Sequence, residues 1–330
     1  MSVLLEVENL DVDIQTSRGV LKAVQDVSFT VAAGETFCIV GESGCGKSMT
    51  ALALMDLMPG VARSSAARLN FCGRGLLGEK GAVSQIRGAG MAMIFQEPMT
   101  SLNPVFTIGS QLTDVFQRHK GGGRQAARER ALFLLRKVGI NNAEDRMGQY
   151  PHELSGGLRQ RVMIAMALMA NPQLIIADEP TTALDVTVQA ELLRLLKDLQ
   201  TEFGMGLVLI THDLGVVSRI ADRVAVMYAG QIVETGDTES LFNRPMHPYT
   251  IALMRCLPSS GGDVSGRLPT IPGVVPSLIG RVHGCRFRER CSFARSACAD
   301  DVDLSVASTR DTSHARRCIL NPEELLHAYA

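Results

Sequence analysis

The chain has 330 residues, of which 46% are hydrophobic and 20% are charged, a composition typical of a globular protein with room for about two domains. Its 33 Lys and Arg residues nearly balance 34 Asp and Glu residues, so a net charge of −1 disfavours nucleic acid or anionic lipid as a partner. The first residues lack the features of a signal peptide, and no run of about 18 apolar residues could span a bilayer. We therefore expect a mature chain that begins near Met1 and reaches a membrane only through partners.

The N-terminal part of the sequence predicts antiparallel strands followed by an α/β core. In the range Leu4–Val31, apolar and polar residues alternate in short runs, which is typical of antiparallel strands. An apolar strand, Thr36–Val40, then enters a glycine-rich loop, and a helix is expected over Lys47–Met58, where a Pro-Gly pair ends it. This strand-loop-helix order predicts an α/β core.

A helical region interrupts this core between about residues 98 and 170. Within it, Ala126–Val138 places leucines and a valine on one face and arginines opposite. Strands resume at Leu174–Ala177 and Leu207–Ile210, and leucines in Val186–Phe203 form a helical stripe between them. The expected fold class is α/β, with an antiparallel β subdomain and a helical subdomain.

The composition changes after about residue 240. Proline-containing turns and a Gly/Ser-rich link at residues 259–266 follow, so we expect a nucleotide-binding domain over residues 1–240 and a small C-terminal extension over residues 241–330. Each nucleotide-binding motif occurs once. The chain is therefore predicted to carry a single ATPase unit rather than two in tandem.

A phosphate loop follows the first buried strand. The segment matches G-x-x-x-x-G-K-[ST] and lies between the strand and the helix that this motif requires. Its glycines bring backbone N–H groups close to phosphate oxygens, Lys47 supplies positive charge at the β- and γ-phosphates, and Ser48 can coordinate Mg²⁺. The residues expected to bind nucleotide here are Gly41, Glu42, Ser43, Gly44, Cys45, Gly46, Lys47 and Ser48.

Two carboxylates, Asp178 and Glu179, end the apolar strand Leu174–Ala177. This arrangement resembles the Walker B motif of ABC ATPases. Asp178 is expected to hold Mg²⁺, and Glu179 is placed to orient or deprotonate the attacking water, a role that requires hydrogen-bond reach to it. Acidic residues after a strand also commonly cap a turn, which is the alternative interpretation.

The segment Leu154–Gln160, with the sequence LSGGLRQ, resembles the signature sequence of ABC ATPases. Ser155 is a good helix N-cap, and Gly156 and Gly157 allow backbone N–H groups to approach phosphate closely. The resemblance implies that this signature contacts ATP held by an opposite subunit, so that two domains sandwich two ATP molecules. One copy in the chain therefore implies a dimer.

The other ABC motifs occur in the family's order. Gln96, after an apolar strand, resembles the Q-loop glutamine and is expected to contact Mg²⁺ and to act in catalysis; Asp185 closes an Ala-Leu-Asp triplet that resembles the D-loop. His212 resembles the histidine switch that contacts the γ-phosphate. One departure concerns adenine, which many members stack on an aromatic residue where this chain has Val20 and Leu21, leaving selectivity for ATP over GTP open.

Three stretches narrow the resemblance to the branch that imports peptides and nickel: Phe95–Pro104, Met227–Gly230 and Arg244–Thr250. The resemblance covers essentially the whole chain. It implies a second, similar ATPase subunit in a heterodimer, two transmembrane permeases, an external peptide-binding protein, and a peripheral position on the cytoplasmic face of the bacterial inner membrane. Hydrolysis would then power the import of dipeptides or oligopeptides. Nickel or another small solute as cargo, or a non-transport ABC ATPase, are the alternatives.

Four cysteines in the extension need an explanation of their own: Cys285, Cys291, Cys298 and Cys318. Their spacing exceeds that of usual zinc knuckles, and a cytosolic location argues against disulfides. Four thiolates fit an iron–sulfur cluster, and the dipeptide-importer ATPases that the chain resembles carry a 4Fe-4S cluster in such a tail; zinc and free thiols are the alternatives. Arginines that could offset the cluster's negative charge are Arg281, Arg286, Arg288, Arg290, Arg295, Arg316 and Arg317.

The extension is short of apolar residues and lies far in sequence from the phosphate loop. We therefore expect it to have little core of its own. Its expected role is structural or redox-sensing rather than a part in hydrolysis.

Overall fold

The computed structural model describes residues 2–79, 81–181, 185–257, 270–280, 282–308, 311–321 and 324–325. The chain divides into two compact units. The first unit comprises Met1–Leu4, Val31–Glu35 and Gly78–Ile210, and the second comprises Leu5–Thr30, Thr36–Leu77 and Thr211–Ala330. Each unit therefore combines segments that are distant in sequence.

Three parallel strands form the sheet of the first unit. β7 (Met91–Ile94) pairs with β8 (Leu174–Asp178), which pairs with β9 (Gly206–Thr211). All but one of their residues are buried, as expected for parallel strands covered on both faces. α8 (Val186–Phe203) connects β8 to β9 and buries its leucine stripe, as predicted.

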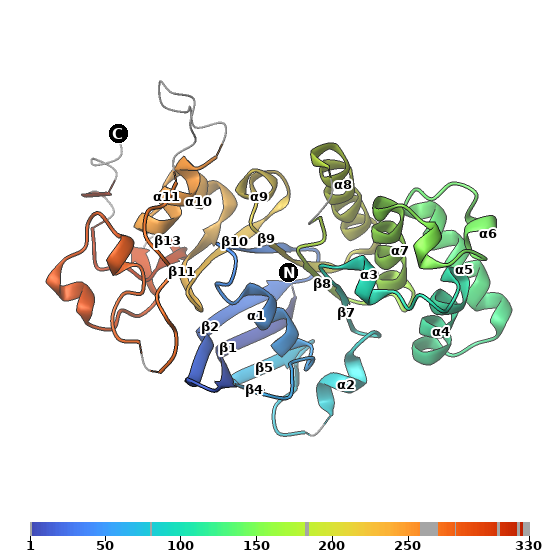
Figure 1. Ribbon diagram of the computed structural model, residues 1–330, viewed down its shortest axis with the longest axis horizontal. Coiled ribbons are helices and arrows are strands. Elements are labelled where there is room, and N and C mark those ends of the chain that lie inside the picture. Colours follow the sequence, from blue (N-terminus) through green and yellow to red (C-terminus); the bar gives the residue numbers. More distant parts are fainter. Residues whose placement is uncertain are drawn as a thin grey trace. The chain divides into compact units, whose positions relative to one another are not determined.

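A group of helices between β7 and β8 makes up most of the rest of the first unit (Figure 1). α4 packs against α5 and α7, and α3 packs against α7. The fully buried side chains of Leu112, Ala131 and Leu134 belong to the core of this group. The helices between β7 and β8 are α3 (Pro98–Ser101), α4 (Ile108–Lys120), α5 (Arg124–Lys137), α6 (Ala143–Arg146), the short 3₁₀ helix η1 (Pro151–Glu153) and α7 (Gly156–Leu168), and α2 (Ala82–Ile86) precedes β7.

An antiparallel sheet opens the second unit. The long strands β1 and β2 pair with each other, and β1 also pairs with β5 and β4. Along β1 buried and less buried residues alternate, with Leu5 and Val7 buried in the first half and Leu10 and Val12 buried further on. The sequence predicted this alternation. The strands are β1 (Val3–Thr16), β2 (Gly19–Ala32), β4 (Ala62–Ser65), β5 (Arg68–Phe71) and β6 (Arg74–Gly75).

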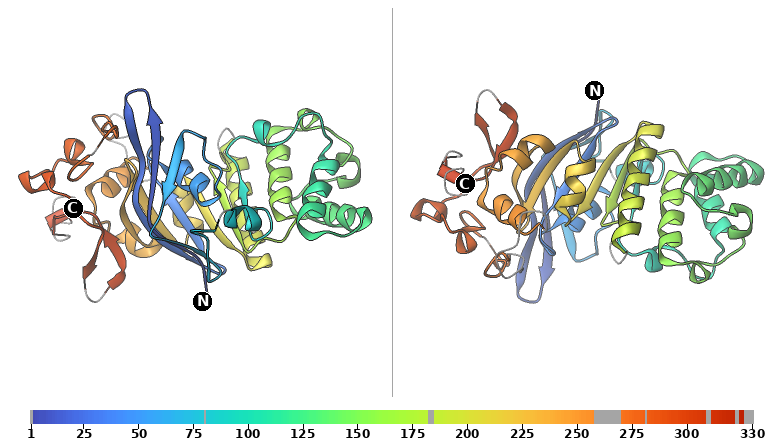
Figure 2. Two further views of the ribbon diagram at one scale, coloured as in Figure 1. Left: turned by 90° about the horizontal axis from the view of Figure 1, so that it is seen from below. Right: turned by 90° about the horizontal axis from the view of Figure 1, so that it is seen from above.

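The second unit also contains a mixed sheet. β3 (Thr36–Val40), all five residues of which are buried, pairs in parallel with β10 (Arg223–Tyr228). β10 pairs antiparallel with β11 (Gln231–Asp237), which is followed in the sheet by β13 (Asp311–Arg316) and β12 (Ser305–Ser308). The last two strands come from the C-terminal extension, drawn in red in Figure 2. The extension therefore continues a sheet that begins beside the phosphate loop.

Short helices complete the second unit. α1 ends at Leu54, earlier than the predicted Met58, because Asp56 has a positive φ of 52° that cannot continue a helix. The helices are α1 (Lys47–Leu54), α9 (Leu214–Ile220), α10 (Thr238–Asn243), α11 (Pro248–Arg255) and the 3₁₀ helices η3 (Arg288–Arg290) and η4 (Ser296–Ala299).

The extension is better packed than its composition predicts. Ile251, Leu320 and Leu325 form a small buried cluster, against which Phe293 and Cys318 pack. These residues are scattered in sequence, so no local apolar pattern revealed them. No helix in the described part of the chain combines the length and apolar content that a membrane span requires.

Candidate functional site

The phosphate loop joins the buried strand β3 to the N-terminus of α1. Lys47 is only 4% exposed, and its Nζ donates hydrogen bonds to the carbonyl oxygens of Gly41, at 2.8 Å, and Glu42, at 3.1 Å. Gly46 has a φ of 105°, and a Cβ there would lie 2.5 Å from the carbonyl oxygen of Ala23. Only glycine fits this position, and the loop consequently curls around the lysine ammonium.

The remaining loop residues occupy the bend and the first helical turn. The backbone N–H of Cys45 donates to the carbonyl of Glu42 at 3.3 Å, and Ser48 is the second residue of α1. The Cys45 side chain is 1% exposed, and burial raises the pKa of its thiol. Cys45 therefore packs as a neutral group, and Ser43 and Gly44 lie between it and Glu42.

The two carboxylates predicted for catalysis lie at the end of β8 in the first unit. Asp178 is the last residue of the strand and is 5% exposed. Glu179 has a left-handed backbone with a φ of 43°, and its N–H donates to the carbonyl of Ile210 at 3.0 Å. Gln96, which follows β7, donates from Nε2 to Oε2 of Glu179 at 3.3 Å. The fold thus brings the predicted Q-loop glutamine and the predicted base together.

The signature segment begins α7 of the first unit. Ser155 is the N-cap, and its Oγ accepts a 3.4 Å hydrogen bond from the N–H of Leu158. Ser155 and Gly156 are exposed, and Gly157 is half-buried. The N-terminal N–H groups of this helix are therefore directed to a surface where a ligand could reach them.

Two further residues that the sequence predicts for the nucleotide site, Asp185 and His212, lie at or just before the start of a helix. Asp185 is the exposed N-cap of α8, and its carbonyl accepts from the N–H of Gln189 at 2.8 Å; the three residues before Asp185 lie outside the described part of the chain. In the second unit His212 is exposed directly after β9. Asp213 caps α9 by accepting from the N–H of Gly215 at 2.8 Å. This cap fixes the turn that carries His212.

The stretch proposed to meet adenine is tied to the extension. The N–H of Gly280 donates to the carbonyl of Val20 at 2.9 Å, and the N–H of Lys22 donates to the carbonyl of Leu278 at 2.9 Å. Between them Leu21 forms an antiparallel bridge with Ile279. Val20 and Leu21 are half-buried, so part of each side chain stays accessible.

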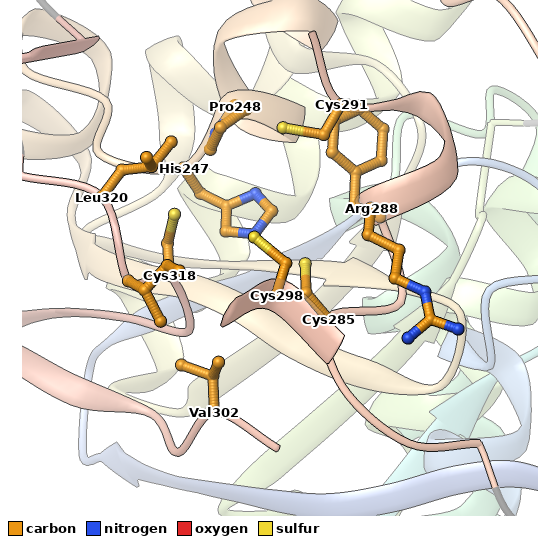
Figure 3. Close-up of a pocket in the computed structure, with 11 residues that line it drawn as sticks. His247, Pro248, Cys285, Arg288, Cys291, Cys298, Val302, Cys318 and Leu320 are labelled. Atoms are coloured by element: carbon orange, nitrogen blue, oxygen red, sulfur yellow. The ribbon is translucent and has the colours of Figure 1, made fainter. Parts of the chain in front are cut away.

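The four cysteines of the extension line one pocket, together with His247 of α11. Figure 3 shows the four side chains around the His247 ring, although they come from separate turns. Burial, together with the neighbouring thiols, raises the pKa of Cys285 to about 11. Burial also raises the pKa values of Cys291 and Cys318. Without a bound cation the thiols of Cys285, Cys291 and Cys318 stay protonated at neutral pH.

The pocket does not have the geometry of a single-ion site. Among the described residues, no three His, Cys, Asp or Glu side chains are grouped closely enough to hold one metal ion. Of the tail arginines, Arg288 lines the pocket, whereas others bind groups outside it. Arg286 donates to the carbonyl of Ala229, and Arg317 pairs with Asp26 at 2.8 Å.

A buried acidic group anchors the turn that carries His247. Glu234 of β11 is fully buried and accepts hydrogen bonds from the N–H groups of Met246, at 2.7 Å, and His247, at 2.9 Å. Its Oε1 also lies 2.8 Å from Nε2 of His314. Burial lowers the pKa of His247 to about 3, so its ring is neutral, and its Nδ1 accepts from the N–H of Tyr249 at 3.1 Å.

The sequence did not predict two contacts that the C-terminal extension makes with the phosphate loop. Arg290 of the extension pairs with Glu42 of the phosphate loop, and the Tyr249 hydroxyl accepts the N–H of Glu42. Both partners lie more than 200 positions away from Glu42. No local pattern could have indicated them.

Two family models match the chain. The ABC transporter model covers residues 24–182, and the model for the C-terminal region of oligopeptide/dipeptide transporters covers residues 233–298. The first range includes the phosphate loop, the signature and both carboxylates. The second includes Arg290 and three of the four pocket cysteines.

Two relatives are similar to nearly the whole chain. A protein of Sinorhizobium fredii, named as a peptide ABC transporter ATP-binding protein, is 49% identical over 318 residues, 96% of this chain and 94% of its own. A protein of Brucella abortus, named as a peptide import ATP-binding protein, is 48% identical over 335 residues, 96% of each chain.

Two solved structures share the fold. The dimeric post-hydrolysis state of the ATP-binding cassette MJ0796, bound to ADP and Pi, is 26% identical with a TM-score of 0.63 and covers 71% of this chain and 98% of that chain. CbiO1 of Clostridium perfringens, part of the ABC transporter complex cbiONQ, has the same identity and TM-score and covers 74% of this chain and 92% of that chain. The chain therefore belongs to the ABC transporter family and is an ATP-binding subunit of its oligopeptide and dipeptide branch.

Proposed function

We propose that this subunit hydrolyses ATP to drive the import of dipeptides or oligopeptides across the cytoplasmic membrane. The observation that carries the proposal is the hydrogen bond between Gln96 and Glu179 at the end of β8, where a base and its orienting amide meet. The relatives named as peptide import proteins support the choice of cargo. Nickel or another small solute is the alternative cargo.

Different residues would bind the nucleotide and activate the attacking water. Lys47 and the N-terminus of α1 would bind the β- and γ-phosphates, and His212 would contact the γ-phosphate. Glu179 would take a proton from the attacking water. Ser155, Gly156, Gly157 and Asp185, all exposed or half-buried, would meet the ATP bound by an opposite subunit.

Mg²⁺ fits the donor groups that the chain offers. The motif positions of Asp178, Gln96 and Ser48 support each of them as a Mg²⁺ ligand, because carboxylate, amide and hydroxyl oxygens are the donors that this ion prefers. When bound, the ion would neutralise charge on the transferred phosphoryl group.

Family membership supports a larger assembly. A second ATPase subunit, two transmembrane permeases and an external peptide-binding protein would complete the transporter, with this chain on the cytoplasmic face of the inner membrane. No nucleic acid partner is proposed.

Uptake by the reconstituted transporter tests the proposal. Proteoliposomes that contain the assembled complex and a radiolabelled di- or tripeptide should accumulate label only with ATP on the side of this chain. Replacing peptide by labelled nickel serves as the matched comparison. Nickel accumulation without peptide accumulation would reject the cargo assignment.

We further propose that the four pocket cysteines hold a 4Fe-4S cluster. Four cysteine side chains line one pocket, and four thiolates are the ligand set that such a cluster requires. Bound iron would hold the thiols as thiolates, although burial raises the pKa values of Cys285, Cys291 and Cys318. A zinc ion bound by the same cysteines is the alternative.

Elemental analysis decides between an iron–sulfur cluster and zinc in this pocket. Protein purified without oxygen should contain iron and sulfide and absorb visible light, and Cys291→Ser should lose both signals. Cys72→Ser, at an exposed cysteine outside the pocket, should keep them. Stoichiometric zinc without iron, or a colourless metal-free protein with a folded extension, would reject the cluster.

A further inference from the structure

Glu42, the second residue of the phosphate loop, is held at three points within the second unit. Its N–H donates to the Tyr249 hydroxyl at 2.9 Å, and its carbonyl accepts from Nζ of Lys47 at 3.1 Å. Its carboxylate forms a bidentate pair with Arg290, with Nη1–Oε2 at 2.7 Å and Nη2–Oε1 at 3.0 Å. Two of the three contacts come from the C-terminal extension.

The Arg290 guanidinium is saturated with hydrogen bonds. Besides the two bonds to Glu42, Nη1 donates to the Tyr228 hydroxyl at 3.3 Å, Nη2 to the carbonyl of Ile271 at 3.1 Å, and Nε to the carbonyl of Pro272 at 2.9 Å. The side chain is 5% exposed. All five N–H donors are therefore used, which fixes both the position and the orientation of the guanidinium.

Aromatic packing supports this arrangement. The rings of Tyr228 and Tyr249 are 4.6 Å apart, and Phe287 contacts both, at 5.2 and 5.3 Å between ring centroids. The Arg290 guanidinium lies 5.7 Å from the Tyr228 ring centroid. Arg290 and Tyr249 are thus presented to the phosphate loop by a packed surface rather than by a free tail.

We propose that Arg290 is a positioning residue for the phosphate loop, which it prepares for ATP by fixing and neutralising the carboxylate of Glu42. The C-terminal extension is thereby part of the nucleotide-binding machinery. The extension lies far from the phosphate loop in sequence, but the fold brings Arg290 to within 2.7 Å of Glu42.

The charge balance gives the physical reason. The loop must receive the negative phosphates of ATP, yet it carries a carboxylate that is only 27% exposed and poorly screened by solvent. Paired with Arg290, this carboxylate adds no net repulsion. Without Arg290 it would repel the phosphates and would no longer be held in place.

Equilibrium binding of radiolabelled ATP to the full-length chain, at fixed Mg²⁺, tests the proposal. Arg290→Gln should raise the Kd for ATP about tenfold, because one uncompensated charge then lies close to the phosphates. Arg290→Lys, which keeps the charge but not the five-donor fork, should give an intermediate Kd. Arg295→Gln is the matched control, since Arg295 pairs with Glu324 on the surface of the same extension.

Two readouts separate this role from a merely structural one. Glu42→Gln in the Arg290→Gln protein should restore the Kd to within about threefold of wild type, since it removes the repelling charge. Raising the salt concentration should also reduce the defect of Arg290→Gln relative to wild type. Thermal unfolding would verify that each variant is folded.

Two outcomes would overturn the proposal. One is a folded Arg290→Gln protein that binds ATP as tightly as the Arg295→Gln control. The other is a double variant that binds ATP as weakly as Arg290→Gln alone, because the defect would then not arise from the Glu42 carboxylate.

Discussion

At the scale of single residues, Glu179 combines backbone strain with a defined partner. A left-handed conformation is unfavourable for glutamate by about 1 kcal/mol or more. The hydrogen bond from its N–H to Ile210 and the contact with Gln96 stabilise this conformation. Glu179 thus leaves the extended conformation directly after Asp178, the last residue of β8.

This geometry predicts the behaviour of Glu179→Gln. The variant should bind ATP normally, because the phosphate loop is untouched, but its turnover in the assembled transporter should fall by on the order of 10² or more. Glu191→Gln, at an exposed residue of α8, should turn over like wild type. Steady-state hydrolysis by Glu179→Gln close to that of wild type would refute the assignment of the base.

At the scale of elements, Glu234 ties the core strand β11 to the extension. It is buried and receives hydrogen bonds from two backbone N–H groups at the start of α11, besides its contact with His314. Glu234→Ala would leave these buried groups unsatisfied and should lower the free energy of unfolding by about 3 kcal/mol or more. Urea denaturation should register this loss, whereas the exposed Glu239→Ala should change stability little. Equal free energies of unfolding for Glu234→Ala and Glu239→Ala would contradict the role of Glu234 in holding the extension.

The elements differ in how far the sequence predicted them. Val186–Phe203 was predicted correctly as a helix and β3 as a strand, because apolar periodicity and flanking glycines are local signals. The α/β fold and the resemblance to the peptide-importer branch are confirmed by the solved structures and the relatives. The roles of Glu179 and His212 stay predictions.

What the sequence could not predict are contacts made between distant elements. In the sequence Arg290 is one of seven arginines near the tail cysteines, whereas in the fold it pairs with Glu42. The packing of Ile251 with Leu325 was likewise hidden, since one side chain lies in α11 and the other near the end of the chain. Such contacts depend on how strands are ordered in a sheet, which residue patterns do not encode.

At the scale of the whole molecule, the exposed signature is the feature on which the proposed dimer depends. Ser155 and Gly156 begin α7 at the surface of the first unit and offer helix N-terminal N–H groups to solvent. The chain carries one such segment and one phosphate loop. A complete hydrolytic site would accordingly combine the signature of one subunit with the phosphate loop of another.

The most direct test compares hydrolysis by the isolated chain with hydrolysis by the assembled transporter at saturating ATP. Light scattering under turnover conditions would establish that the isolated chain is monomeric. A shared site predicts that the monomer hydrolyses ATP at least about tenfold more slowly, because the opposite signature no longer stabilises the transition state. A verified monomer that hydrolyses ATP as fast as the intact transporter would contradict the shared site and the assembly built on it.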